Sequence, residues 1–89
     1  MLFMWYTYLL YSLKSKRKYI GFTNDLRRRI KEHNEGNGGS YTKNNRPFVL
    51  IYYEAFLSKK DAQKQEEFYK TGYGRKVLDA KINYSLKQI

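Results

Sequence analysis

The stretch YIGFTNDLRRRIKEH (residues 19–33) joins a short apolar segment to a cationic one through a glycine. Its second half predicts a helix, because Thr23 or Asn24 can cap the first turn and Asp25 follows where a carboxylate is favourable. We expect this helix to run to about residue 34 and to end at Gly36. A helix that served only solubility would mix its charges, whereas this one places three arginines in a row.

One face of the expected helix combines apolar and polar side chains. Leu26, Ile30 and His33 recur at i, i+4 and i+7 and therefore share that face. Arg29 precedes His33 by one turn and lies beside them, half-buried. A half-buried guanidinium requires a partner, which the sequence offers as Glu66 or as a bound phosphate.

The segments on either side of this helix predict a small sheet. Residues 4–11 are aromatic and aliphatic on both faces, as in a central strand, and residues 18–22 form a second strand beside it. The glycine-rich residues 36–40 are expected to form a flexible loop. Residues 46–56 predict a third strand, with Pro47 at its start, where a missing N–H is tolerated.

Two further helices are expected after the third strand. Ser58 caps the first of them, with Asp61 at the capping-box position, and Gly72 is expected to end it. Residues 75–83 predict a last short helix. The order strand, strand, helix, strand, helix, helix indicates an α+β fold, a three-stranded sheet packed against helices in one domain covering residues 1–89.

Charge and aromatic content narrow the class of partner. The chain has 89 residues, with 18 Lys and Arg against 8 Asp and Glu, and a formal net charge of +10. Its 10 tyrosines are interleaved among these cations, and this combination suits the bases and phosphates of nucleic acid. The absence of cysteine excludes disulfides and zinc sites of the Cys type.

The apolar start of the chain, MLFMWYTYLLYSL (residues 1–13), is not expected to be a membrane segment. It falls short of the ~20 residues that a membrane-spanning helix requires. It also has no basic region before its apolar part, as a secretory signal would. We therefore expect a buried strand, a cytoplasmic location and no membrane partner.

Five side chains form a set that suits phosphodiester cleavage. An arginine neutralises charge that develops on a phosphate, and a phenol or imidazole accepts a proton from attacking water. A single carboxylate can hold a hard cation such as Mg²⁺, with water and phosphate completing its coordination shell. The set is Tyr8, Tyr19, Arg29, His33 and Glu66.

The spacing of these residues resembles the GIY-YIG nuclease superfamily. YTY (6–8) is followed by YIG (19–21), with eleven residues from Tyr8 to Tyr19, and the later positions fit as well. Residues 42–54 and 62–76 resemble small stand-alone members from bacteria and archaea, and the resemblance covers residues 4–83. It implies an antiparallel three-stranded sheet flanked by helices, a divalent metal (Mg²⁺ or Mn²⁺) and hydrolysis of phosphodiester bonds in DNA.

The resemblance also implies roles for the five residues. Tyr8 and Tyr19 are the two signature tyrosines, one of which acts as general base. Arg29 contacts the scissile phosphate, and His33 assists proton transfer or orients a tyrosine. Glu66 binds the metal; it is preferred to its neighbour Glu67 because it follows Ala62 by four residues, on the face that packs inward.

Two positions depart from the family pattern. The first triplet is Tyr-Thr-Tyr rather than Gly-Ile-Tyr, so only its last tyrosine matches. Many members carry an asparagine about twelve residues after the glutamate. Here that neighbourhood reads Val77-Leu78-Asp79, and Asn83 comes too late. This difference bears on catalytic efficiency more than on the fold.

Further residues are expected to contact nucleic acid, although some of these side chains could instead simply face solvent. The cationic turn that ends at Lys18 can contact phosphate or form a solvated tip, and Lys70 can pair with phosphate or with Glu66. Arg27 and Arg28 follow phosphates or face solvent. The expected contacts are Gly21, where a phosphate can approach closely, and Lys18, Arg27, Arg28, Lys43, Arg46 and Lys70.

The sequence thus predicts a metal-dependent endonuclease that acts on DNA, with RNA as an alternative substrate. A non-catalytic nucleic-acid-binding module and a protein-interaction domain with a tyrosine-rich surface are the competing classes. Sequence specificity is expected to be low or to come from a partner protein. A monomer and a homodimer are both compatible with the sequence.

Overall fold

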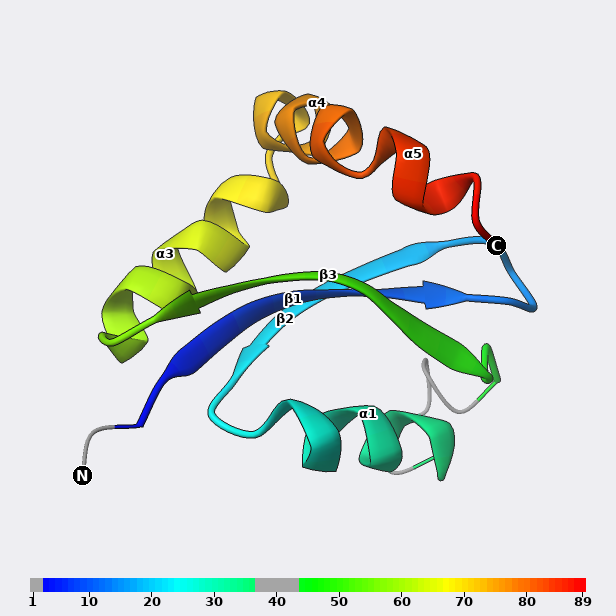
Figure 1. The fold of residues 1–89 in the computed structure, drawn as a ribbon, viewed down its shortest axis with the longest axis horizontal. Helices are drawn as coiled ribbons and strands as arrows, with labels where there is room; N and C mark the ends of the chain where they lie inside the picture. Colours follow the sequence, from blue (N-terminus) through cyan, green and yellow to red (C-terminus); the bar gives the residue numbers. More distant parts are fainter. Residues whose placement is uncertain (1–2, 37–43) are drawn as a thin grey trace.

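A three-stranded antiparallel sheet forms the centre of the computed structural model, which describes residues 3–36 and 44–89 (Figure 1). Its strands are β1 (Trp5–Ser12), β2 (Lys18–Thr23) and β3 (Phe48–Phe56). They lie in the order β2-β1-β3, so β1 is the central strand, as its aromatic and aliphatic sequence predicted. The α+β fold with an antiparallel sheet is therefore confirmed.

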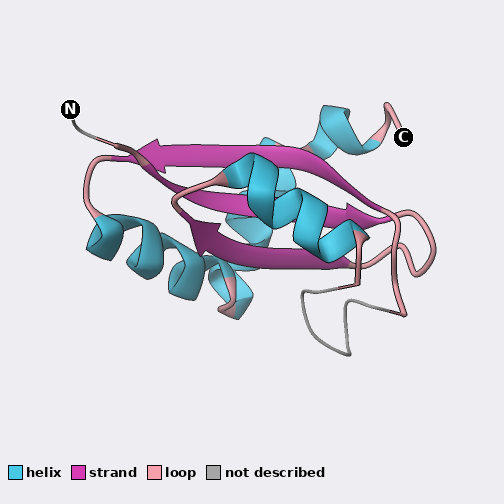
Figure 2. Cartoon of the chain, turned by 90° about the horizontal axis from the view of Figure 1, so that it is seen from below, coloured by secondary structure: helices cyan, strands magenta, loops and turns pink. Residues whose placement is uncertain are grey.

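Helices cover both faces of this sheet. Helix α1 (Leu26–Asn34) lies across the strands on one face (Figure 2). Helices α3 (Lys59–Tyr69), α4 (Gly72–Lys81) and α5 (Asn83–Leu86) lie on the other (Figure 1). No helix within residues 3–36 and 44–89 has the length and apolar character needed to cross a membrane.

Alternation along β1 gives the sheet two small cores. Leu9 points to the three C-terminal helices and packs with Tyr69, Leu78 and Ile82. Its neighbours Tyr8 and Leu10 point to the opposite face, where they pack with Phe48, Leu26 and Ile30. Because side chains alternate between faces along a strand, each core depends on the same register of β1.

The first helix begins slightly differently from expectation and ends as predicted. Asp25 rather than Thr23 or Asn24 is the N-cap, and its side chain accepts a hydrogen bond from the backbone N–H of Arg28 at 3.1 Å. All three residues are good caps, so sequence preference alone did not separate them. Gly36 follows the helix end with φ 84°, the left-handed conformation expected there. Of the predicted loop at residues 36–40, only Gly36 lies within the described residues.

The expected role of Gly72 is wrong. Helix α3 already ends at Tyr69, with Lys70 as its C-cap, and Gly72 is the first residue of α4. Thr71 caps α4 by accepting from the N–H of Gly74 at 2.9 Å. The sequence did not distinguish a glycine that ends one helix from a glycine that begins the next. The short helix α5 was also not predicted as a separate element.

A polar network fixes α3 against β3 and α4. The Tyr69 hydroxyl donates to the Glu54 carboxylate on β3 and accepts from Lys81 Nζ on α4 at 2.9 Å. Gln65 Nε2 donates to Glu54 at 3.1 Å. Burial and the hydrogen bond to Glu54 raise the pKa of Tyr69 to about 12, so its hydroxyl stays protonated and keeps donating. The network thus fixes the position of α3, the helix that carries Glu66.

Two glycines of α4 should respond oppositely to the same substitution. A Cβ at Gly74 would lie 2.6 Å from the carbonyl carbon of Phe68, whereas a Cβ at Gly72 would meet nothing within 4 Å. We expect Gly74→Ala to lower the free energy of unfolding by about 2 kcal/mol, through overpacking. Gly72→Ala should raise it by about 0.5 kcal/mol, because alanine restricts the unfolded chain. Urea unfolding of both variants measures this, and equal effects would contradict the packing of α4 on Phe68.

Candidate active site

The close approach of Tyr8 to Gly21 organises the site. In the β1–β2 ladder Tyr8 lies opposite Gly21, and Leu10 opposite Tyr19, so these side chains share the α1 face. The Tyr8 phenol lies over Gly21: a Cβ there would overlap the Tyr8 hydroxyl and lie 2.5 Å from Cζ. Glycine is therefore required at this position by the tyrosine ring itself.

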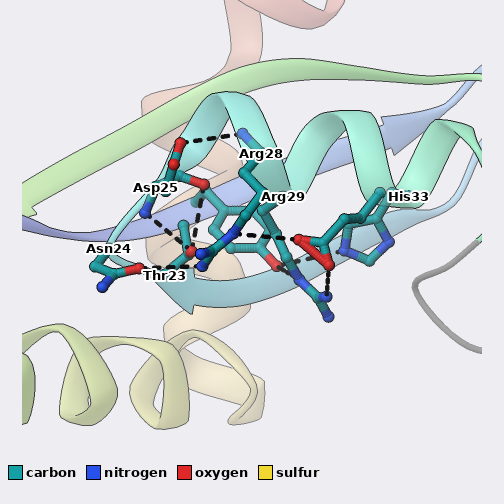
Figure 3. A network of polar contacts seen from close by, with 8 residues as sticks. Thr23, Asn24, Asp25, Arg28, Arg29 and His33 are labelled. Carbon is teal, nitrogen blue, oxygen red and sulfur yellow. Dashed lines mark hydrogen bonds and ion pairs between the residues drawn. The ribbon is translucent and has the colours of Figure 1, made fainter.

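Helix α1 brings two side chains to the Tyr8 hydroxyl. Arg29 Nε donates to Tyr8 Oη at 3.3 Å, and His33 Nε2 lies 3.5 Å from the same oxygen. Arg29 and His33 are one turn apart and project toward the same region (Figure 3). If the Tyr8 hydroxyl accepts from Arg29 and donates to His33, the imidazole carries its own proton on Nδ1, an assignment that follows from this network.

The Tyr8 hydroxyl is kept protonated at neutral pH. Burial is the main cause that raises the pKa of Tyr8 above 10.0, because it disfavours the phenolate. The hydrogen bond from Arg29 and its positive charge oppose this increase, while the carboxylates of Glu66 and Glu32 add to it. The phenol therefore acts as a donor and acceptor of hydrogen bonds rather than as a resident anion.

His33 is neutral in the same environment. It is 5% exposed, and burial lowers its pKa below 6.5. The charge of Arg29 lowers this pKa further, and Glu32 partly opposes the effect. Among the described residues, no hydrogen-bond partner reaches His33 Nδ1. A neutral imidazole beside a protonated phenol can accept the phenol's proton through Nε2.

Glu66 completes the site from the opposite layer of the fold. Its side chain is 17% exposed and lies near Lys70, with Lys70 Nζ 3.6 Å from Glu66 Oε2. A cavity of about 250 Å³ brings this carboxylate together with side chains of β1, β2 and α1. The lining includes Tyr8, Tyr19, Gly21, Arg29, His33 and Glu66.

The structure thus gathers all five residues of the predicted catalytic set around Gly21, although their roles stay predictions. Of the two expected partners of Arg29, Glu66 is corrected: the hydrogen bond goes to Tyr8, and the ion pair joins Nη1 to Glu32 Oε2 at 3.7 Å, while a contact with phosphate stays a prediction. Glu32 was missed in the sequence, although its i, i+3 spacing from Arg29 was a usable signal. Lys70 adopts the ion-pair alternative with Glu66.

The other described residues predicted to contact nucleic acid do not line this cavity. Arg28 pairs with Glu32 at 3.4 Å and Lys18 with Asp79 at 2.9 Å, while Arg46 is exposed just before β3. Arg27 lines a different hollow, between α1 and β3. Lys43 lies outside the described residues. Their contacts with nucleic acid stay predictions.

Comparison with known proteins assigns the family. Residues 4–83 match the model of the GIY-YIG catalytic domain. The chain belongs to the GIY-YIG family. The UPF0213 protein CPE1444 of Clostridium perfringens is 43% identical over 83 residues, which cover 93% of this chain and 88% of that protein. The UPF0213 protein YazA of Bacillus subtilis is 46% identical over 57 residues, which cover 64% of this chain.

The similarity extends to a solved structure. The solution NMR structure of the UPF0213 protein BH0048 from Bacillus halodurans has a TM-score of 0.52 and 35% identity, and the match covers 86% of this chain and 83% of that one. The matches span 58% of the length of YazA and 64% of a Bacillus pumilus relative. The GIY-YIG family is a nuclease family, whereas the names of these UPF0213 relatives state no activity.

The low pKa of His33 should make stability depend on pH. The unfolded chain binds a proton to this residue near pH 6.5, and the folded chain only at lower pH. The free energy of unfolding should therefore fall as the pH drops from about 6.5 toward the folded-state pKa. Urea unfolding between about pH 7 and 5 measures this decline. His33→Gln should flatten it.

The protein has one histidine, so its NMR titration can be assigned without ambiguity. A measured pKa at or above 6.5 would contradict the buried, neutral imidazole. Arg29→Gln should raise the pKa of His33, because it removes the positive charge beside the ring.

Proposed function

We propose that this GIY-YIG protein is a divalent-metal-dependent endonuclease that hydrolyses phosphodiester bonds of DNA. The observation that carries the proposal is the convergence of Tyr8, Arg29, His33 and Glu66 on one small cavity over Gly21. Tyr8 and His33 can accept protons. Arg29 is a cation that can bind a phosphate, and Glu66 is a carboxylate that can bind a metal. These four side chains come from three elements that are far apart in the sequence.

The donor set fits Mg²⁺ better than a metal that needs several protein ligands. No group of three or more His, Cys, Asp or Glu suited to a metal occurs within the described part of the chain. Mg²⁺ is commonly held by one or two carboxylates together with water and substrate phosphate. Glu66 can supply that single carboxylate, and a metal would take the place of the Lys70 ammonium, whose Nζ lies 3.6 Å from Glu66 Oε2. When bound there, the metal would neutralise charge on the phosphate oxygens.

The protein's own groups then account for positioning and proton transfer. Arg29, hydrogen-bonded to Tyr8, keeps donors on its guanidinium for a phosphate oxygen in the cavity. A water molecule attacks the phosphorus and gives its proton to Tyr8 Oη, while the Tyr8 proton passes to His33 Nε2. As the new O–P bond forms, the bond to the leaving oxygen breaks, and that oxygen takes a proton from solvent.

The contacts of Tyr8 favour it over Tyr19 as the tyrosine that handles the proton. Tyr8 Oη is the atom that both Arg29 and His33 approach, at 3.3 and 3.5 Å. The Tyr19 ring packs edge-on against Phe48 at 5.1 Å between centroids, which suits a role in shaping the cavity. The long distances around Tyr8 are compatible with catalysis, because such contacts tighten when substrate binds.

Metal-dependent cutting should disappear when Glu66 is neutralised. We expect Glu66→Gln to reduce cleavage of labelled DNA with Mg²⁺ or Mn²⁺ by about 100-fold or more. Glu67→Gln is the matched control, since Glu67 is the neighbouring residue and is exposed. It should cut like the unmodified protein, and chelator should abolish cutting by both proteins.

Equal loss of activity in the Glu66 and Glu67 variants would remove Glu66 from the site. Binding of DNA without cutting in any metal would instead favour the non-catalytic binding module. Parallel assays with RNA decide between the two nucleic acids as substrate.

The two signature tyrosines should differ in importance. Tyr8→Phe removes the hydroxyl between Arg29 and His33 and should lower the single-turnover rate by about 100-fold. Tyr19→Phe should lower it by less than about tenfold, since its ring still packs on Phe48. Single-turnover cleavage at saturating metal measures both rates. A larger loss in Tyr19→Phe would reverse the assignment of the general base.

A further inference from the structure

A second, more cationic hollow adjoins the active site along the edge strand β2. It has a volume of about 680 Å³ and shares Tyr19 and Ile20 with the active-site cavity. We call it the β2 groove. Three cations from the β1–β2 turn and β2 line one wall, and two from the end of α3 and the start of α4 line the other. They are Lys16, Arg17, Lys18, Lys70 and Arg75.

We propose that the β2 groove binds the phosphodiester backbone of the nucleic acid beside the phosphate that enters the active site. This binding role extends the proposed nuclease function and rests on it only for the cleavage of DNA at the neighbouring cavity. It assigns a binding role to Arg75, which sequence patterns did not single out. It also explains why five cations from different elements line one hollow beside β2.

The groove and the active-site cavity are neighbours that share lining residues and are linked by an ion pair. Lys70 lines the groove, and its Nζ lies 3.6 Å from the Glu66 carboxylate of the active site. A strand whose phosphate contacts Arg29 can therefore place neighbouring phosphates along the groove cations. Because phosphates repeat along the strand, a row of cations can contact several of them, and each contact releases bound counterions.

One carboxylate opposes this binding. Asp79 on α4 lines the groove and pairs with Lys18 on β2, with Nζ 2.9 Å from Oδ1. Both side chains are partly exposed, at 34% and 53%, so a phosphate can reach Lys18 and compete for it. Asp79 thus pairs with one cation of the groove and also repels the negatively charged nucleic-acid strand. Its removal should strengthen binding, which is opposite in sign to removal of the cations.

The backbone at Lys16 gives independent support. Lys16 has φ 63° and is the only residue other than glycine with positive φ in the described ranges 3–36 and 44–89. Glycine and asparagine adopt this left-handed conformation more readily than lysine. A lysine here costs stability, and an observed outlier of this kind points to a function of the side chain. Its position on the groove wall provides one.

The test is DNA binding without cutting. A short fluorescein-labelled DNA duplex is titrated with each variant by anisotropy in chelator, over a series of salt concentrations. Arg75→Gln and Lys18→Gln should each weaken binding by about fivefold and reduce the slope of log affinity against log salt by about 1. Asp79→Asn should strengthen binding by about threefold.

Lys76→Gln is the matched control. Lys76 follows Arg75 on the same helix, is exposed, and carries the same charge, but it does not line the groove. It should change binding by less than twofold, which separates a local contact from the general effect of net charge. Lys16→Gly should weaken binding as Lys18→Gln does while its thermal unfolding midpoint stays equal or rises, because glycine relieves the backbone.

Two results would overturn the proposal. One is an effect of Arg75→Gln no larger than that of Lys76→Gln, and the other is weaker binding in Asp79→Asn. Groove variants that leave DNA binding unchanged but weaken binding to an acidic protein would assign the groove to a protein partner. Because binding is measured in chelator, failure of the protein to cut DNA with metal would refute the proposed nuclease and leave the groove result standing.

Discussion

The packing of the Tyr8 ring over Gly21 is the constraint on which the site depends. The register of the β1–β2 ladder puts these residues opposite each other, and only glycine leaves room for the phenol. The same register sends Leu9 to the other core. A slip of one residue would move Tyr8 away from α1 and disrupt both cores at once. Stability of the sheet and geometry of the site are therefore fixed by one arrangement of strands.

Charge in the site is balanced within a small volume. Arg29 contacts the phenol and an acidic neighbour, His33 is held neutral, and Glu66 faces a lysine. In the proposed function, these groups would meet a phosphate and a cation already in place. Preorganised charge of this kind is worth more than in water, because the partly buried groups need little rearrangement when the reaction proceeds.

Much of this could be predicted from residue patterns along the chain. The strands, α1 and the Ser58 cap follow from local preferences. The spacing of tyrosine, arginine and histidine predicted which residues belong to the candidate site. The predictions that were wrong or missing concerned choices between residues of similar preference, or contacts between residues far apart in the sequence. Asp25 outcompeted two other good caps, and Gly72 began a helix that Thr71 caps. The pairing of Arg29 with Tyr8, and of Lys18 with Asp79, joins segments whose proximity only the folded chain reveals.

The position of β2 at the edge of the sheet has a consequence for association between copies of the protein. An open edge strand presents unpaired backbone N–H and C=O groups that can join a strand of another molecule, and charged residues, lysine above all, discourage such pairing. Lys18 lies on this edge, and the turn that precedes it carries Lys16 and Arg17. These three cations therefore disfavour pairing between the β2 edges of two molecules, so variants that lack several of these charges should associate more readily.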